Sequence, residues 1–265
     1  MNFPLYKKEM KGSWKLLVIF AGILAMYICV IVSMFDPELA QAMAQFEELM
    51  PQVMAAVGMT NPGDTLASFL SAYLYGMILL VFPMVYTIIR ANGLVAKYVE
   101  QGSMAQLLSA PVKRQRIVLT QLAALFSGVV LLVLFCTALE YAAAQLMFPG
   151  ELDLSQLLAL NGGLLALHLF MAGFCFLCSC IFNESKYALG VSAGVLSVSY
   201  LLQMLANMGG RLENLKYATF FTLFNPNGLL EGSGSAWGGI GVLLALALLC
   251  SSLSILVFCK KDMPV

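Results

Sequence analysis

Long apolar runs alternate with short polar segments along almost the whole chain. Six runs are long enough to cross the hydrocarbon core of a membrane as a helix, which takes about 20 residues. Because lipid offers no partner to an unpaired backbone amide, we expect each run to be helical. The predicted spans cover approximately residues 14–35, 66–89, 117–139, 157–182, 187–208 and 237–259. The pattern thus predicts one all-α integral membrane domain over residues 1–265.

Composition supports this class of protein. Hydrophobic residues make up 61% of the chain and charged residues only 11%, whereas a soluble domain has about a quarter of its residues charged. The mean hydropathy is +0.88. These values exclude a water-soluble globule, a disordered chain and a nucleic-acid-binding protein. A transmembrane β-barrel would show short alternating segments, and unbroken apolar runs such as residues 129–135 argue against it.

The positions of the basic residues predict the orientation in the membrane. Six spans place both termini on the same side, and 12 of the 14 Lys and Arg residues fall on that side. The exceptions are Arg211 and Lys216. Cytoplasmic loops carry an excess of Lys and Arg. We therefore expect a multi-pass protein of the cytoplasmic membrane with both termini in the cytoplasm.

The first 13 residues are amphipathic. Phe3, Leu5, Tyr6 and Met10 are interleaved with three lysines. This pattern suits a short helix that lies in the inner headgroup layer, with its lysines toward anionic lipid. The alternative is a disordered basic tail. We predict an N-terminal interfacial helix that precedes the first span.

The first outer loop, residues 36–64, contains no basic residue. Asp36 and Pro37 together form a typical helix start. Apolar residues then recur every three to four positions, which predicts a surface helix with a methionine-rich stripe: Met43, Phe46, Met50, Met54 and Val57. Thioethers can bind copper(I), but no His or Cys accompanies these methionines. We therefore predict no metal site here.

The loop between the second and third spans is too polar to cross the membrane and too patterned for a slack linker. Gly102 interrupts the helix that leaves the membrane, and Ser103 can cap a new helical turn. Met104, Leu107 and Leu108 lie on one side of that turn, and Pro111 ends it. The basic residues Lys113, Arg114 and Arg116 then mark the inner headgroup level.

This pattern predicts a short cytoplasmic helix, held between two spans, that presents a small apolar surface. A helix of this kind is a compact docking element, because it fits a groove on another protein. An ordinary amphipathic loop is the alternative interpretation.

The segment from Glu100 to Arg114 resembles a known signature. It reads EQGSMAQLLSAPVKR and is similar to the acidic-x-Gly-Thr, Leu-Leu and Pro-Val-basic pattern in the membrane subunits of type-2 ABC transporters. Ser103 stands where Thr is commoner. Residues 183–190 resemble the short inner loop of the same family, and the span count and loop order also agree. The resemblance implies a coupling helix that binds the ATP-binding subunit through Glu100, Gly102, Ser103, Met104, Leu107, Leu108 and Pro111.

The loop between the fifth and sixth spans contains an apolar stretch, residues 217–224. It is too short to span and too apolar to be solvated, so we predict a re-entrant or interfacial segment. Pro226, with Asn225 and Asn227, should break it. The family resemblance implies re-entrant half-helices on the outer side that line the exit of a lateral pathway.

The chain has no nucleotide-binding signature. A G-x-x-x-x-G-K-[ST] loop is absent from the sequence, so ATP and its Mg²⁺ are expected on a partner subunit and no cofactor on this chain. The resemblance implies two permease chains, identical or paralogous, with two ATP-binding subunits. We expect a transport subunit without catalytic residues of its own.

Two further motifs favour packing over chemistry. Residues 190–194 match G-x-S-x-G, but a nucleophile elbow needs a strand-to-helix turn, and this match lies in a predicted span. An intramembrane serine hydrolase centred on Ser192 is therefore the least favoured alternative. Cys175, Cys178 and Cys180 could ligate metal only as thiolates in lipid, so packed thiols are the favoured interpretation. All seven cysteines lie in predicted spans, which predicts no disulfide framework.

Two ionisable residues lie in or near the membrane, His168 in the fourth predicted span and Glu140 at the outer end of the third. Such residues are candidates for function by default. His168 could face a dimer interface or a substrate path, or it could be neutral and bonded to a carbonyl of a neighbouring helix. Glu140 could serve the same path or extend outward to the headgroups.

We therefore predict the permease subunit of an ATP-driven exporter. Its cargo is expected to be lipidic, amphipathic or an apolar peptide, because the spans are lined by Leu, Phe, Met and Ala. The alternative is a secondary transporter or channel that acts without ATP. Such transporters usually contain inverted repeats, and no internal repeat relates residues 1–130 to residues 131–265.

Overall fold

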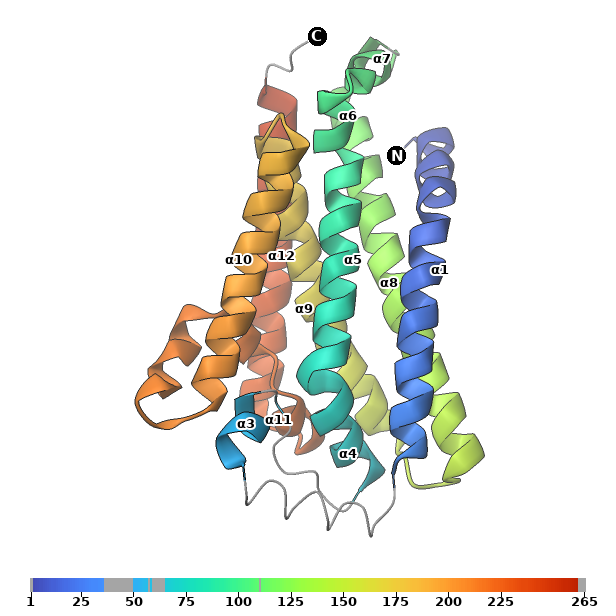
Figure 1. Ribbon diagram of the computed structural model, residues 1–265. Coiled ribbons are helices and arrows are strands. Elements are labelled where there is room, and N and C mark those ends of the chain that lie inside the picture. The colour runs from blue at the N-terminus through green and yellow to red at the C-terminus, as the bar shows by residue number, and fades with distance from the viewer. Residues whose placement is uncertain (1, 36–49, 57, 59–64, 110, 262–265) are drawn as a thin grey trace.

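The computed structural model describes residues 2–35, 50–56, 58, 65–109 and 111–261. Within these ranges the chain forms an all-helical bundle without strands (Figure 1). Six helical segments are long and apolar enough to cross a membrane, as predicted. Five are single helices, namely α1 (Phe3–Ser33), α8 (Arg114–Met147), α9 (Leu154–Ile181), α10 (Ser185–Asn207) and α12 (Gly234–Lys260).

The second span, Leu66–Glu100, is assembled from four elements. These are α4 (Leu66–Tyr73), the π-helical turn η1 (Leu74–Ile78), α5 (Leu79–Leu94) and α6 (Ala96–Glu100). Pro83 lies inside α5 and cannot donate a backbone hydrogen bond. A π-turn likewise displaces carbonyls from the regular helical ladder. The second span therefore contains backbone groups that must find partners on other helices.

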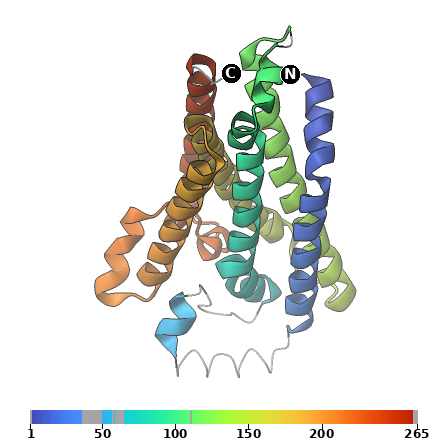
Figure 2. The same cartoon turned by 45° about the horizontal axis from the view of Figure 1, so that its top comes forward.

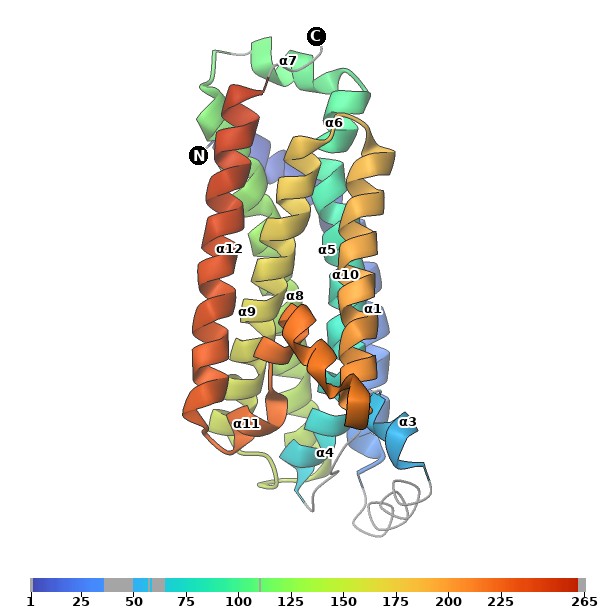
Figure 3. The same cartoon turned by 90° about the vertical axis from the view of Figure 1, so that its left-hand side faces the viewer.

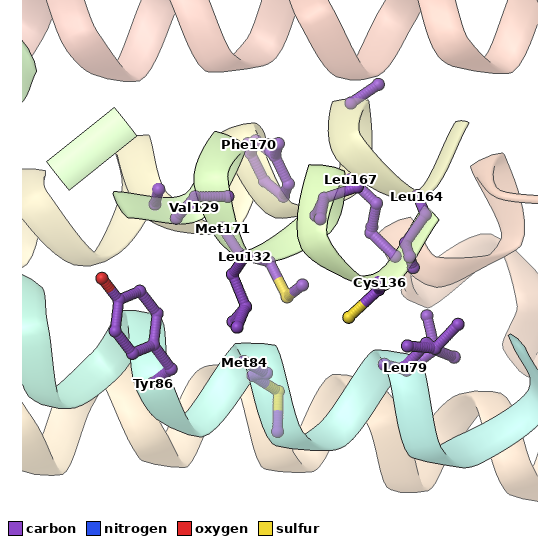
Figure 4. Close-up of a cluster of buried hydrophobic side chains, with 14 of the residues drawn as sticks. Leu79, Met84, Tyr86, Val129, Leu132, Cys136, Leu164, Leu167, Phe170 and Met171 are labelled. Atoms are coloured by element: carbon purple, nitrogen blue, oxygen red, sulfur yellow. The ribbon is translucent and has the colours of Figure 1, made fainter. Parts of the chain in front are cut away.

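Helix α9 is the centre of the bundle and packs against α12, α5, α8 and α10. Gly173 allows α12 to approach closely, since a Cβ there would lie 3.1 Å from the carbonyl oxygen of Ala247. Figure 4 shows the core, where apolar side chains of α5, α8 and α9 converge. Helices α1, α10 and α12 keep exposed apolar faces, as expected of surfaces that meet lipid.

The N-terminal segment differs from the prediction. Residues 3–13 are helical, but they continue without a break into the first span as part of α1. The side chain of Asn2 accepts from the amide of Leu5 and caps the helix. The backbone amide of Asn2 donates to Thr120 at 2.8 Å, and the hydroxyl of Tyr6 donates to Ser127 at 2.9 Å. These bonds align the segment with α8, so it forms no separate interfacial helix.

The two ends of the bundle carry different elements (Figure 2). The start of α1, the end of α12 and the short helix α7 (Ser103–Ser109) lie together at one end. The opposite end carries α3 (Pro51–Ala56), the start of α4 and α11 (Pro226–Leu230). The methionine-rich helix predicted for the first outer loop overlaps α3. Its other residues, 36–49 and 57, lie outside the described ranges.

The connection between α10 and α12 folds back along the bundle (Figure 3). The 3₁₀ helix η2 (Gly210–Ala218) returns beside α10, and η3 (Phe220–Leu223) follows it. Phe221 is buried and contacts Tyr200 edge to face, with ring centroids 5.5 Å apart. Pro226 then begins α11, capped by Asn225, whose side chain accepts from the amide of Gly228. The connection, residues 209–225, thus packs against α10 and α12; we keep the name re-entrant segment for it, and its entry into the membrane stays a prediction.

Candidate functional site

Helix α7 begins at a sharp reversal of the chain. Gly102 adopts a φ of +69°, a conformation that favours glycine. The hydroxyl of Ser103 donates to the carbonyl oxygen of Tyr98 at 3.2 Å. Ser103 is the first residue of α7, and its predicted role as the cap of that helix stays a prediction. The bond holds α7 at a fixed angle to the second span.

The apolar side of α7 faces its own chain. Met104 is only 2% exposed, and Leu107 and Leu108 are half-buried against the core. Met104 is therefore not part of a free apolar surface, whereas Leu107 and Leu108 stay partly exposed and their role in docking stays a prediction. The exposed residues of the segment are mostly polar: Glu100, Gln101, Gly102, Gln106, Ser109 and Pro111. Any partner on this helix would meet that polar side, with Met104 as the anchor behind it.

The basic residues after α7 tie three helix ends together. Lys113 and Arg116 are exposed, and Lys113 is the residue that precedes α8. Arg114 donates to the carbonyl oxygen of Lys261 at 3.1 Å. Lys261 in turn donates to the carbonyl oxygens of Cys180 and Ile181 at the end of α9, at 3.0 and 2.6 Å. Burial lowers the pKa of the Lys261 ammonium group, and the carbonyl dipoles at this helix end favour the cation.

A buried ion pair joins α1 to the second span at the same end. Arg90 donates to the Glu9 carboxylate at 3.3 Å and to the backbone oxygen of Glu9 at 2.8 Å. Tyr98 donates to the other carboxylate oxygen at 2.8 Å. The side chains of Arg90 and Glu9 are 10% and 5% exposed. Sequence reasoning missed this pair, although a lone acid among the lysines of the first segment was a visible signal.

His168 bonds a backbone carbonyl of the second span that has no helical donor. Its Nε2 lies 2.8 Å from the carbonyl oxygen of Leu79, and the side chain is fully buried. This carbonyl is the one that would accept from the amide of residue 83 in a regular helix, and Pro83 has no amide hydrogen. A carbonyl can only accept, so Nε2 carries the proton. The structure thus has the carbonyl-bonded arrangement, while a role at a dimer interface or substrate path stays a prediction.

Glu140 belongs to a buried polar cluster near the other end of the bundle. The hydroxyl of Tyr75, in the π-turn η1, donates to Glu140 Oε2 at 2.8 Å. Asn161 Nδ2 donates to the same oxygen at 3.0 Å and to the Tyr75 hydroxyl at 2.5 Å. Glu140 is fully buried, so its predicted extension toward the headgroups is wrong. The cluster links the second span, α8 and α9.

A cavity of about 380 Å³ opens beside this cluster. Tyr75 and Gly76 of the second span, Tyr200 of α10 and Phe221 of the re-entrant segment line it. Glu213 and Lys216 also line this cavity and form an exposed ion pair at 2.8 Å. The pair lowers the pKa of Glu213 and raises that of Lys216. The re-entrant segment therefore forms one wall of a polar opening at the end opposite α7.

The serine and cysteine motifs pack against each other. Ser192 of α10 is buried, as are the free thiols of Cys175 and Cys178 on the neighbouring helix α9. His168 is committed to Leu79, so the geometry gives no support to a serine hydrolase centred on Ser192. Across the described residues, all cysteines are free thiols and no three potential metal ligands gather in one place.

Comparison with known families settles the class of protein that these features suggest. A profile of the ABC-2 family transporter proteins matches residues 4–263. The chain belongs to the ABC-2 family. No curated protein matches it at a significant level. With six spanning helices, the chain is a multi-pass membrane permease of the ABC transporter class. Permeases of this family generally work with an ATP-binding subunit.

Proposed function

We propose that this chain is the permease subunit of an ATP-driven exporter and that a separate ATP-binding subunit docks on α7. The observation that carries the proposal is the form of α7. It is a short helix with an exposed polar side, fixed to the second span by the Ser103–Tyr98 bond and to the core by Met104. The family match supports the need for such a partner.

The coupling would pass from α7 into the second span. ATP and Mg²⁺ would bind on the partner, whose closure would move α7. Because the Ser103–Tyr98 bond and the buried Met104 side chain connect α7 to its own chain, such a movement would displace the second span. The partner can shift the conformational equilibrium only by its differential affinity for the two states of the permease. Rigid connections of this kind favour a two-state response over a gradual one.

Two permease chains, identical or paralogous, would form the transport path. The exposed apolar faces of α1 and α10 support assembly with lipid and with a second chain. The cargo would be lipidic, amphipathic or an apolar peptide, and it would leave toward the end that bears the re-entrant segment. A secondary transporter would instead depend on an ion gradient and would need no ATP.

Substitutions on the exposed side of α7 test the proposal. Gln106→Arg combined with Ser109→Arg adds two bulky charges at the proposed contact without touching Met104. We expect the variant to fold normally and to lose co-purification of the ATP-binding subunit by about tenfold or more, since interface charges that lack partners are costly. The matched control is Gln115→Arg, an exposed glutamine on α8. It should keep the partner.

Reconstitution in vesicles tests whether transport needs the ATP-binding subunit and ATP. The permease alone should not move cargo, and addition of the ATP-binding subunit with ATP should start transport. Undiminished capture of the ATP-binding subunit by the double variant would contradict docking on α7. Full-speed transport by the permease alone would contradict the ATP-driven mechanism.

A further inference from the structure

The second span is interrupted shortly before it reaches α7. Val95 has a φ of −129° and a ψ of −66°, which are not helical values, and it separates α5 from α6. The amide of Ala96, the first residue of α6, donates to the hydroxyl of Ser179 in α9 at 2.9 Å. A side chain that bonds to the backbone within a helix is a usual cause of a kink. The angle between α5 and α6 is therefore set by contacts with other helices.

Helices α6 and α7 are joined to each other by local bonds. The amide of Gly102 donates to the carbonyl oxygen of Val99 at 3.0 Å. The hydroxyl of Ser103 donates to the carbonyl oxygen of Tyr98 at 3.2 Å. We call the two helices together, residues 96–109, the α6–α7 arm, and Figure 3 shows that α7 crosses the end of the bundle. A change in the angle at the break would move the whole arm.

One carboxylate of α1 bonds to both sides of the break. Glu9 Oε2 accepts from Arg90, which lies in α5 before the break, at 3.3 Å. Glu9 Oε1 accepts from the hydroxyl of Tyr98, which lies in α6 after the break, at 2.8 Å. Arg90 also donates to the backbone oxygen of Glu9 at 2.8 Å. Glu9 is only 4% exposed, and hydrogen bonds to a charged group are strong when water is excluded.

We propose that Glu9 is a positioning residue for α7. Arg90 fixes Glu9 to α5 by two bonds, and the hydroxyl of Tyr98 fixes the α6–α7 arm to the same carboxylate. Glu9 thereby sets the angle of the arm across the break at Val95. This inference rests on the proposed docking of the ATP-binding subunit on α7, and it adds α1 to the elements that define the docking geometry.

Neutralisation of the arginine alone does not explain this arrangement. A buried arginine needs a counter-charge, and Glu9 meets that need without any contribution from Tyr98. The Tyr98 hydroxyl nevertheless reaches the carboxylate from the other side of the break. The ammonium group of Lys8 lies 5.5 Å from the centroid of the Tyr98 ring. Two consecutive residues of α1 thus contact one side chain of the arm, which is the arrangement expected if the arm is what they hold.

A single hydroxyl can be removed to test the proposal. Tyr98→Phe removes the bond to Glu9 and leaves the ion pair with Arg90 in place. The matched control is Tyr6→Phe, because the Tyr6 hydroxyl also joins α1 to another helix at the same end of the bundle, where it donates to Ser127 of α8 at 2.9 Å. Each variant lacks one hydroxyl between α1 and its neighbour, but only Tyr98 belongs to the arm.

Hydrogen–deuterium exchange of the full-length purified permease in detergent measures how firmly the arm is held. In Tyr98→Phe we expect the amides of residues 96–109 to exchange about tenfold faster, as the loss of one hydrogen bond to a charged group implies. Peptides from α9 and α12 should exchange as in the wild-type chain, because the opening is local. Tyr6→Phe should leave the exchange of residues 96–109 unchanged.

Capture of the ATP-binding subunit provides a second measurement. A segment that is less ordered before binding loses affinity, because its ordering must then be completed in the complex. Tyr98→Phe should therefore bind the ATP-binding subunit more weakly than the wild-type chain does, and Tyr6→Phe should bind it equally well.

Two outcomes would overturn the proposal. Unchanged exchange of residues 96–109 in Tyr98→Phe would show that Glu9 only neutralises Arg90. Faster exchange throughout the chain, or equally in Tyr6→Phe, would show a general loss of stability. Faster exchange confined to the arm, with undiminished capture of the ATP-binding subunit, would support the positioning role and contradict docking on α7. The two proposals therefore fail separately.

Discussion

Several polar side chains that are buried in this permease make hydrogen bonds to the backbone or to one another. His168 donates to the carbonyl that Pro83 leaves without a helical donor. Tyr75 and Asn161 both donate to the carboxyl group of Glu140. In an apolar interior an unsatisfied polar group costs far more than a typical hydrogen bond contributes. His168 and the Glu140 cluster therefore act as structural partners within the spans.

We expect the effects of substitutions at His168 and Pro83 on stability to depend on each other. His168→Leu removes the donor to Leu79 and should destabilise the folded permease by about 2 kcal/mol, because the carbonyl becomes a buried unsatisfied acceptor. Pro83→Ala restores a backbone amide to the same carbonyl. We expect the His168→Leu substitution to cost clearly less in the Pro83→Ala background. Thermal unfolding in detergent of the four variants measures this coupling.

The double-mutant comparison separates this role from simple packing. If His168 only fills space, His168→Leu should cost the same in both backgrounds, since the effects of substitutions that share no partner add. Such additivity would be evidence against the hydrogen-bond role assigned to His168.

At the scale of elements, two segments depend on glycine residues. Helix α7 requires the positive φ of Gly102. The re-entrant segment packs against α12 at Gly239, where an added Cβ would clash with the carbonyl oxygen of Leu223. The same segment reaches α9 at Gly163, which contacts Phe224 and Leu229. The small residues of the spans thus position the two connections that the function is expected to use.

Gly239→Ala should displace the re-entrant segment from α12. The expected cost is about 1–3 kcal/mol, as for other overpacked positions, because a backbone oxygen cannot move aside like a flexible side chain. Gly241→Ala is the control, since a Cβ there meets nothing within 4 Å. A cysteine introduced at Thr222 reports the displacement through its rate of reaction with a thiol reagent. Equal rates in the two alanine variants would show that Gly239 does not hold the segment.

At the scale of the whole molecule, charge separates the two ends of the bundle. The start of α1, the loop with α7 and the end of α12 carry most of the lysines and arginines, and these elements lie together. At the same end, Arg90 and Glu9 tie α1 to the second span, and Lys261 ties α12 to α9. The basic residues thus serve packing as well as orientation.

This charge asymmetry predicts the labelling pattern of introduced cysteines. Glu151→Cys lies in the α8–α9 connection and should react with an impermeant maleimide in intact cells. Gln115→Cys, at the start of α8, should react only after the membrane is opened, because its end is cytoplasmic by the positive-inside rule. The wild-type chain gives the background from its native thiols. The opposite pattern would reverse the proposed orientation.

The sequence predicted the presence of each span because the surrounding lipid acts on each apolar run separately. Lipid forces apolar runs of sufficient length into helices, so all six spans were located, although the first three helical segments extend 8 to 11 residues beyond the predicted bounds. The start of α7 was also predicted, since Gly102 and the residues around it form a local signal. The connection after α10 was predicted to be re-entrant or interfacial, because its apolar stretch was too short to span and too apolar for water, and that choice stays a prediction.

The partners of individual side chains could not be predicted in this way. Met104, Leu107 and Leu108 were assigned to a docking surface, but Met104 is buried and the two leucines are half-buried against the core. Periodicity shows that a short helix has an apolar side, but both a partner protein and the chain itself can cover that side. The bonds of Glu9 to Arg90 and of His168 to Leu79 each join residues more than 80 positions apart. No local pattern encodes such distances.

The sequence by itself determined that the chain is a six-span helical membrane protein with a basic end, because hydrophobicity, span length and charge act locally against lipid and water. It also pointed to the ABC-2 family through the segment from Glu100 to Arg114. Only the tertiary structure decided that Met104 of α7 is buried, which carbonyl His168 bonds and where the cavity beside the Glu140 cluster opens. Those features arise from contacts between helices, and such contacts exist only once the bundle has assembled.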